Sequence, residues 1–204
     1  MSADKIKQYY REQAYEQHIH LYMALQCAPL LKRILPACIV SVENRMLPVL
    51  FAELERTGLV GKRLHQGNTR TIIFLYNTMH LAACLRTKEV RSLLTRYGYC
   101  YMTRFERDCP AAVEALVGQL VPRMQEFYMR KGEFPHEIGC FLGYPPADVE
   151  AFVSNRGQGY KLSGYWKVYA DVAYAQAVFR KCDHAREEAV EQVLAGRKFY
   201  EIVA

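Results

Sequence analysis

Apolar and polar residues follow one another along the chain with two different periods. Near the N-terminus apolar side chains recur about every 3.6 residues, which predicts a helix over residues 4–25. Two compact runs rich in β-branched and aromatic residues, at 37–42 and 71–76, predict buried strands. A further strand is expected at 165–169, where the alternation has a period of two.

Helices are predicted for most of the sequence between these strands. Apolar stripes bounded by N-capping residues, prolines and C-terminal glycines mark them. They are expected at residues 47–57, 78–85, 88–97, 110–127, 135–142, 146–155 and 172–195. Strands separated by helices favour the α+β or α/β class. We therefore expect one helix-rich domain over residues 1–204, built around a small sheet of about three to five strands.

Composition narrows the class of protein further. Of the 204 residues 51% are apolar, which allows a sizeable core within the length of a single domain. No run of about 18 apolar residues is present and residues 1–7 are polar, so we expect no membrane segment and a cytoplasmic protein. The seven cysteines are scattered without a C-x-x-C pair, which favours buried reduced thiols over disulfides or a metal site. The sequence requires no cofactor.

Positive charge is concentrated in one stretch of the chain. The formal net charge is +6, and residues 56–96 hold eight basic side chains against the single acid Glu89. These basic residues are Arg56, Lys62, Arg63, Arg70, Arg86, Lys88, Arg91 and Arg96. The block is either an ordinary solvated face or a surface that attracts an acidic protein, a phosphorylated ligand or nucleic acid.

Two segments carry the most distinctive motifs. Residues 134–149 read FPHEIGCFLGYPPADV, which we call the first signature segment. Residues 164–169 read GYWKVY, which we call the second signature segment. Together with the Cys27-Ala28-Pro29 element, they resemble an uncharacterised bacterial family catalogued as domain of unknown function 3793. The resemblance extends over nearly the whole chain.

The chain departs from the family pattern around its N-terminal element. Gln26 stands where the family often has His before the cysteine, and Leu35-Pro36-Ala37 stands where Lys-Pro-Ala is usual. The resemblance implies a protein typical of anaerobic Gram-positive bacteria, in which some members are encoded near flavodoxin or ferrous-iron transport genes. It implies a link to iron or redox physiology and no particular reaction.

Cys27, His136 and Glu137 are the candidate catalytic residues. We expect a short helix to begin at Pro29, which would place Cys27 at a helix N-terminus, where the thiolate is stabilised and the pKa of the thiol is lowered. With His136 as base and Glu137 or Asp148 as its orienting group, Cys27 would form a cysteine-dependent hydrolase or transferase site.

His136 and Glu137 also have a structural interpretation. They fall in the first turn of the helix predicted at 135–142, where free backbone N–H groups favour a carboxylate. Glu137 would then complement the helix dipole, while His136 would hydrogen-bond a neighbouring loop. The functional interpretation makes them an acid/base pair or metal ligands, and the sequence leaves both open.

The glycine-containing loop at 155–164 offers a binding site of another kind. It combines a flexible backbone with Arg156 and Lys161, as anion-binding loops do. The loop leads into a strand and not into a helix, so it fits neither the P-loop nor the dinucleotide fingerprint. Ordinary turn glycines are the alternative.

The strand that follows this loop is expected to have two different faces. Alternation places Trp166 and Val168 on a core face, and Tyr165, Lys167 and Tyr169 on the other. We expect the tyrosine and lysine face to line a groove beside the helix of the first signature segment. The candidate ligand-binding residues are therefore Arg156, Lys161, Tyr165, Trp166 and Lys167.

Three hypotheses of different classes follow. The leading one is a cytosolic accessory or interaction protein of iron or flavodoxin-type redox physiology, which docks an acidic redox protein such as flavodoxin on the 56–96 surface. The second is the cysteine-dependent enzyme, and the third is a small-ligand or nucleotide-binding module. Sequence-specific DNA binding is not expected, because Asp148 and Glu150 in the predicted 146–155 helix would repel phosphate.

Overall fold

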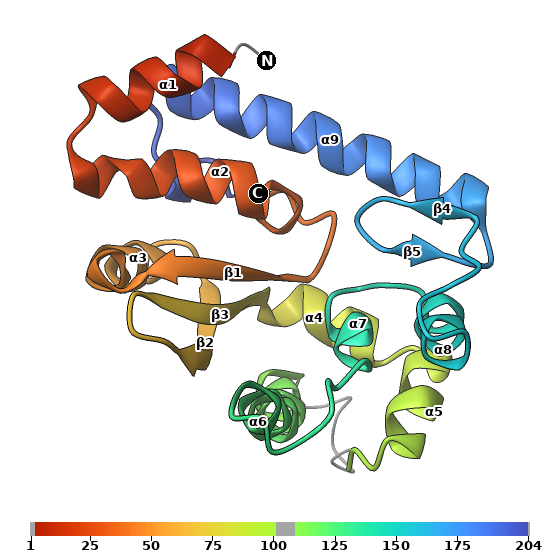
Figure 1. The fold of residues 1–204 in the computed structure, drawn as a ribbon. Coiled ribbons are helices and arrows are strands. Elements are labelled where there is room, and N and C mark those ends of the chain that lie inside the picture. The colour runs from red at the N-terminus through yellow and green to blue at the C-terminus, as the bar shows by residue number, and fades with distance from the viewer. Residues whose placement is uncertain (1–2, 101–108, 204) are drawn as a thin grey trace.

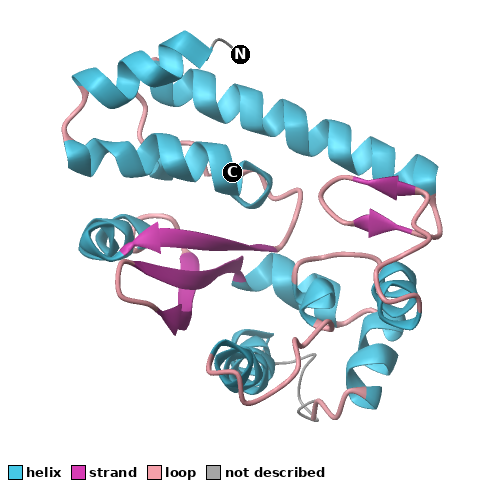
Figure 2. Cartoon of the chain, viewed as in Figure 1, coloured by secondary structure: helices cyan, strands magenta, loops and turns pink. Residues whose placement is uncertain are grey.

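The computed structural model describes residues 3–100 and 109–203 (Figures 1 and 2). The helices are α1 Ala3–Glu12, α2 His18–Leu31, α3 Leu47–Leu54, α4 Thr78–Leu85, α5 Lys88–Arg96, α6 Cys109–Tyr128, α7 Ile138–Phe141, α8 Pro146–Ser154 and α9 Val172–Leu194. The strands are β1 Ala37–Glu43, β2 Leu59–Gln66, β3 Arg70–Asn77, β4 Leu162–Ser163 and β5 Lys167–Val168. Short 3-10 turns lie at Tyr15–Gln17, Asn44–Met46 and Phe199–Glu201.

A three-stranded sheet with the order β1-β3-β2 lies at the centre of the fold, and both of its pairings are antiparallel. The central strand β3 is buried on both faces, which explains its continuous apolar run. Ile73 and Leu75 pack into the cluster that includes α2, whereas Phe74 and Tyr76 pack into the cluster that includes α4 and α6. The fold therefore belongs to the α+β class, with helices on both faces of a small antiparallel sheet (Figure 1).

The long helix α9 forms an outer layer over α2 (Figure 1). Small residues of the two helices, Ala24 and Ala28 of α2 with Ala185 and Ala189 of α9, share one buried cluster. The N-terminal end of α9 reaches the hairpin formed by β4 and β5 (Figure 1). This hairpin and α7 and α8 form the corner of the molecule that carries both signature segments.

Several predicted elements are present with the expected ends. The strands predicted at 37–42 and 71–76 are β1 and β3. Asn77 caps α4 by accepting a hydrogen bond from His80 N at 2.9 Å, and Asp171 caps α9 by accepting one from Tyr174 N at 2.9 Å. These caps satisfy N–H groups that a helix start leaves free.

The element predictions were wrong or incomplete at four places. The helix predicted over 4–25 is interrupted, because Tyr15 leaves the helical path to donate a 2.6 Å hydrogen bond from its hydroxyl to Glu43 Oε2 on β1. The proline at 29 does not begin a helix and instead lies inside α2. Strand β2 was not predicted, and the strand expected at 165–169 is reduced to Lys167–Val168.

Candidate ligand-binding pocket

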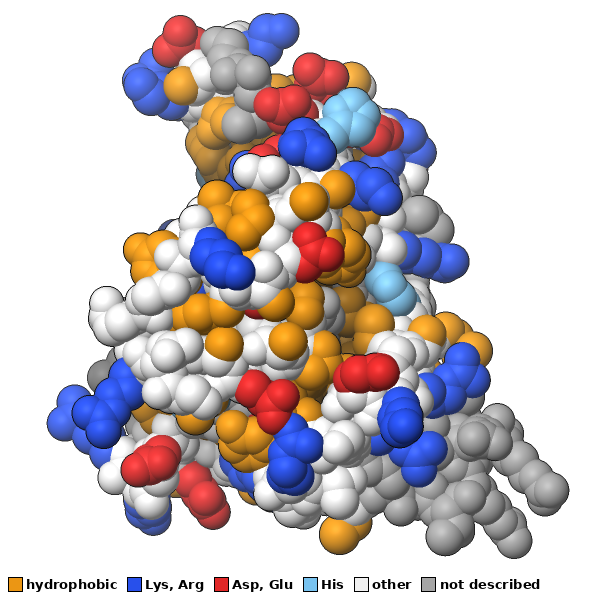
Figure 3. Space-filling model, turned by 90° about the vertical axis from the view of Figure 1, so that its right-hand side faces the viewer, with side chains coloured by type: hydrophobic (Ala, Val, Ile, Leu, Met, Phe, Trp, Pro, Cys, Tyr) orange, Lys and Arg blue, Asp and Glu red, His pale blue; other side chains and the backbone are white. Residues whose placement is uncertain are grey.

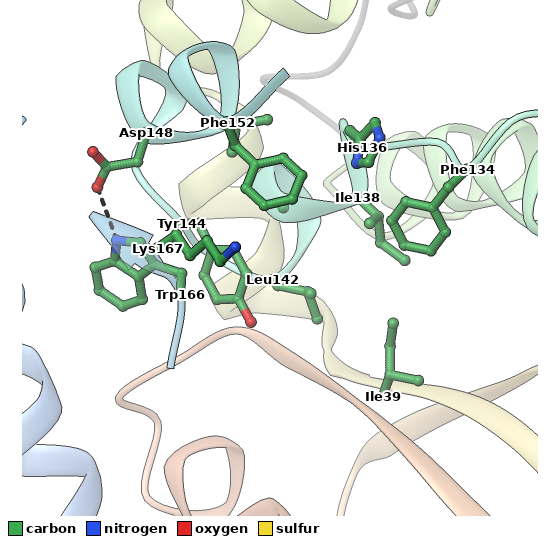
Figure 4. A pocket seen from close by; sticks show the side chains of 12 residues that line it. Ile39, Phe134, His136, Ile138, Leu142, Tyr144, Asp148, Phe152, Trp166 and Lys167 are labelled. Atoms are coloured by element: carbon green, nitrogen blue, oxygen red, sulfur yellow. Dashed lines mark hydrogen bonds between the residues drawn. The ribbon is translucent and has the colours of Figure 1, made fainter. Parts of the chain in front are cut away.

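A pocket of about 230 Å³ lies where the two signature segments meet (Figure 4). Its walls come from α7, α8 and the turn between them, from the end of the hairpin at β5, and from β1 of the central sheet. It is lined by Ile39, Phe134, His136, Ile138, Gly139, Leu142, Tyr144, Asp148, Val149, Phe152, Trp166 and Lys167. Most of these side chains are apolar or aromatic, and the polar groups are few.

Asp148 joins the two signature segments to each other. Its carboxylate is buried and accepts hydrogen bonds from Trp166 Nε1 at 2.8 Å, from Tyr169 N at 2.8 Å and from Ala170 N at 2.9 Å. Figure 4 shows the bond to the indole at one end of the pocket. Three donors satisfy a carboxylate that burial would otherwise destabilise. The role of Asp148 is therefore to fix the indole, and it does not orient His136.

Trp166 forms one wall of the pocket through its ring contacts. Its centroid lies 5.3 Å from that of Tyr144, in a stacked arrangement, and 4.6 Å from that of Phe179 on α9, edge to face. Gly164 allows this packing, because a Cβ there would lie 2.3 Å from the Phe179 ring. The prediction that Trp166 and Val168 share a buried face is confirmed, although Trp166 also lines the pocket.

His136 lies at the other end of the pocket, between two phenylalanine rings (Figure 4). The ring centroids of Phe134 and Phe152 lie 5.1 and 5.2 Å from that of the imidazole. No hydrogen bond of the imidazole is found within residues 3–100 and 109–203. The predicted hydrogen bond from His136 to a neighbouring loop is therefore not found in this part of the chain.

Lys167 is the cation of the pocket. Its Nζ donates a 2.8 Å hydrogen bond to the carbonyl oxygen of Gly157 and lies 4.8 Å from the ring centroid of Tyr160 and 5.6 Å from that of Phe152. These contacts come from α8 and the loop that follows it. They fix the position of the ammonium group beside the pocket.

Three of the predicted ligand-binding residues are not in the pocket wall. Arg156 is exposed and occupies a left-handed turn with φ 52°, and Lys161 is exposed, with its Nζ 3.4 Å from the carbonyl oxygen of Ala170. Tyr165 points away to donate a 3.0 Å hydrogen bond to Asp183 Oδ1 on α9. The structure thus groups His136, Trp166 and Lys167, and the glycine loop mainly forms the connection between α8 and β4.

Of the two interpretations of Glu137, the structure favours the structural one. Helix α7 begins only at Ile138, so His136 and Glu137 precede it and do not lie in its first turn as predicted, and Glu137 does not line the pocket. The buried Glu137 pairs through its Oε1 with Arg123 Nη1 at 3.2 Å and accepts a 3.2 Å hydrogen bond from the Tyr99 hydroxyl. Arg123 also stacks over the Tyr99 ring at 4.3 Å. Burial and the neighbouring Glu137 carboxylate raise the pKa of Tyr99, which keeps the hydroxyl a donor. Glu137 therefore holds α6 and α7 together.

The basis for Cys27 as a nucleophile was also wrong. Cys27 is fully buried within α2, one turn before the helix ends, so no helix N-terminus acts on its thiol. Burial raises the pKa of Cys27 well above its usual range, and the neighbouring Cys38 raises it further. The thiol donates to Met23 Sδ at 3.8 Å and lies in the apolar cluster between α2 and the sheet. Cys27 is a packing residue in this fold.

Three of the eight basic residues of 56–96 form ion pairs with carboxylates. Lys62 pairs with Glu114, Arg70 with Glu43, and Arg96 with Glu150, all carboxylates from outside the block. On the side of the molecule that carries α5 and α8, Lys and Arg side chains lie in small separate groups among acidic and uncharged ones (Figure 3). These pairings favour the solvated-face interpretation of the block.

Several pocket residues were not singled out from the sequence. Ile39, Phe134 and Phe152 belong to apolar patterns that look like ordinary core, and only the tertiary arrangement opens space beside them. Ile39 is one of four half-buried residues of β1. The described ranges contain no group of three or more His, Cys, Asp or Glu that could hold a metal ion.

Sequence comparison identifies the family to which these segments belong. The profile of the family described as "Protein of unknown function (DUF3793)" matches residues 23–203. The chain belongs to this family. No curated protein and no solved structure matches the chain significantly. In this DUF3793 member the matched region contains every residue of the pocket wall, whereas α1 and the first turn of α2 precede it.

No helix among the described residues of this DUF3793 protein combines the length and the apolar character needed to cross a membrane.

Proposed function

We propose that this DUF3793 protein is a small-ligand-binding module whose ligand occupies the pocket between α7, α8 and β5. The observation that supports this is the convergence of His136 and Lys167 on a mostly apolar cavity. Small-molecule sites in proteins have this character: concave, mostly apolar, with a few placed polar groups that fix orientation.

The size of the pocket suits a small ligand. An engineered apolar cavity of about 150 Å³ accepts benzene, and a water occupies about 30 Å³ of liquid. A pocket of about 230 Å³ therefore has room for one aromatic ring with a short substituent. A dinucleotide or a haem would have to extend well beyond it.

The walls of the pocket are fixed before any ligand enters. Asp148 holds the Trp166 indole, Phe179 supports its far side, and the Gly157 carbonyl holds the Lys167 ammonium. Binding to such a site immobilises few further side chains, which limits the entropic cost of association. Preformed walls thus favour binding of a small ligand with useful affinity.

The docking of an acidic redox protein such as flavodoxin, and a link to iron physiology, remain predictions. The cysteine-dependent enzyme receives less support, since Cys27 is buried with a raised pKa and Asp148 is committed to the Trp166 indole and two backbone N–H groups. A binding module needs neither a nucleophile nor a free base.

A thermal-shift screen tests the proposed function. The panel holds aromatic acids, amides and amines, together with flavins, nucleotides and haem. A ligand at 100 times its Kd stabilises the folded state by about 2.7 kcal/mol, which raises the Tm of a chain of this size by roughly 5–10 °C. We expect at least one small aromatic compound to do so, and none of the larger cofactors to do better.

A matched pair of variants localises the binding. Ile39→Phe adds volume at the pocket wall, while Ile72→Phe makes the same change at a half-buried β3 position on the same sheet face, outside the pocket. Ile39→Phe should abolish the ligand-induced shift and Ile72→Phe should keep it. If no compound shifts the Tm, or if both variants respond equally, the proposed function is wrong.

A further inference from the structure

The polar groups of the pocket differ in how many of their hydrogen-bonding positions are already occupied. Each oxygen of the buried Asp148 carboxylate has a donor, and the single N–H of Trp166 is committed to that carboxylate. The indole has no donor left for a ligand, and the carboxylate has about one acceptor position left. Lys167 and His136 are therefore the groups with the most hydrogen-bonding capacity left for a ligand.

Lys167 has unused hydrogen-bond donors. An ammonium group carries three N–H donors and no acceptor. One is directed at the Gly157 carbonyl, and no other hydrogen bond of this ammonium is found within residues 3–100 and 109–203. A ligand oxygen that approaches Nζ can therefore form a charge-assisted hydrogen bond, which is shorter and stronger when the oxygen belongs to an anion.

The surroundings of Lys167 favour an anion over a cation. Arg156 and Lys161 are exposed on the connection that leads into the same hairpin, and both are positive. Asp148 is the one carboxylate in the pocket wall, and three hydrogen bonds already stabilise its charge. Glu150 on α8 is paired with Arg96. Lys167 thus balances the charge of Asp148 within the pocket wall, and the exposed Arg156 and Lys161 add positive charge beside it, which concentrates anions near the pocket.

The rest of the wall recognises an apolar ring. Phe134 and Phe152 line the pocket near His136, and Tyr144 and Trp166 line it near the hairpin (Figure 4). Aromatic rings pack against one another by offset stacking and by edge-to-face contacts. A flat ring placed between these side chains would lie beside the Lys167 ammonium.

We propose that the pocket binds a small aromatic carboxylate, with the ring among the aromatic side chains and the carboxylate on Lys167. This inference rests on the proposed binding function and specifies its ligand class. What this inference adds to the proposed function is the negative charge of the ligand. It predicts that an acid binds more tightly than the amide or the amine built on the same ring.

Fluorescence of Trp166 tests the charge preference directly. Trp166 is the only tryptophan of the chain and it lines the pocket, so its emission reports on occupancy. Phenylacetate, phenylacetamide and phenethylamine are titrated into the full chain. We expect phenylacetate to bind at least about tenfold more tightly than phenylacetamide, from the added strength of a charged hydrogen bond, and phenethylamine to bind most weakly.

Two lysine variants assign the preference to one side chain. Lys167→Met keeps an apolar stem and removes the charge, and Lys161→Met makes the same change on the same hairpin outside the pocket wall. Lys167→Met should abolish the roughly tenfold preference for the acid, and Lys161→Met should retain it. Lys167→Gln serves in the same comparison if Lys167→Met does not fold, which a thermal melt shows.

The outcomes separate this inference from the function on which it rests. Equal affinity for the acid and the amide in the wild-type chain, or an undiminished preference in Lys167→Met, would overturn the carboxylate inference and leave a neutral-ligand pocket. No change of emission or Tm with any compound of the panel would overturn both proposals.

Discussion

Asp148 places a full negative charge in a site from which water is almost excluded. Two backbone N–H groups and one indole N–H point at it, from residues that directly follow or belong to the second signature segment. Hydrogen bonds to a charged group contribute about 1.5–3 kcal/mol each, and a donor left without an acceptor costs a similar amount. The pairing of Asp148 with Trp166 thus links two segments that are far apart in sequence.

Asp148→Asn tests this role of the carboxylate. The amide keeps one oxygen for the backbone donors, but its NH₂ group would face the Trp166 N–H, so one donor stays unsatisfied. We expect the free energy of unfolding to fall by roughly 2–3 kcal/mol, measured by urea denaturation with far-UV circular dichroism.

A double-mutant cycle with Trp166→Phe provides the control for this prediction. Phenylalanine keeps an aromatic ring against Tyr144 and Phe179 and removes the donor. The double variant should lose less stability than the sum of the two single variants, because both changes remove the same hydrogen bond. Additive losses would show that Asp148 acts through something other than the indole.

At the scale of elements, the hairpin and α9 approach closely at Gly164. A Cβ on this residue would lie 2.3 and 2.5 Å from two carbons of the Phe179 ring, closer than side-chain atoms normally pack. A Cβ on Gly118, inside α6, would meet no neighbouring atom of the described residues within 4 Å, and the φ of Gly118 is not positive. Substitution by alanine should therefore have opposite effects on stability at these two glycines.

Gly164→Ala should destabilise the chain by about 1–3 kcal/mol through overpacking. Gly118→Ala should instead stabilise it by about 0.5–1 kcal/mol, because alanine is the better helix former. Both are measured by urea unfolding. Combining Gly164→Ala with Phe179→Leu should recover part of the loss, and a full, unrelieved loss in that double variant would contradict the role of the ring.

The C-terminal turn Phe199–Glu201 is tied to α2 through His20. The imidazole is buried, and its Nδ1 lies 3.5 Å from Phe199 N. Burial, together with the neighbouring Lys198, lowers the pKa of His20 from 6.5 to about 4, and Glu201 opposes part of the shift. His20 is therefore neutral in the folded protein at neutral pH.

The pKa of His20 predicts a particular dependence of stability on pH. Because the unfolded chain binds this proton more readily, the contribution is complete above about pH 6.5 and is lost as the pH falls towards 4. The loss amounts to roughly 3 kcal/mol. His20→Gln keeps an acceptor for Phe199 N and does not titrate, so its unfolding free energy should fall less over this interval. If the unfolding free energies of the wild-type chain and of His20→Gln fall equally between pH 6.5 and 4, His20 is not the group responsible.

The sequence predicted the elements whose pattern is local. β3 was predicted because both of its faces are buried, and α4 and α9 because Asn77 and Asp171 cap them. β2 was missed because Gly61 and two basic residues follow Val60 and interrupt the apolar pattern. This segment becomes a strand through its pairing with β3. The break before α2 depends on the contact of Tyr15 with Glu43, which no local pattern contains.

At the scale of the whole molecule, the pocket combines parts from both halves of the chain. The signature motifs pointed to His136, Trp166 and Lys167, because their residue types are unusual for a plain core. Ile39 closes the pocket from the central sheet, and its contribution depends on how the α7–α8 corner packs beside β1. The sequence indicated which segments carry the site, whereas the roles of Cys27, Glu137 and Asp148 depend on burial and partners that only the fold provides.

The indole N–H resonance of Trp166 gives the most direct test of the binding function. The chain has one tryptophan, so a ¹⁵N-labelled sample shows one indole N–H signal, and this N–H is bonded to Asp148 at the wall of the pocket. A compound that raises the Tm should shift this signal saturably in the wild-type chain and in Ile72→Phe, and leave it in place in Ile39→Phe. A signal that stays fixed while the compound still raises the Tm would place the binding site elsewhere and contradict the assignment of this pocket.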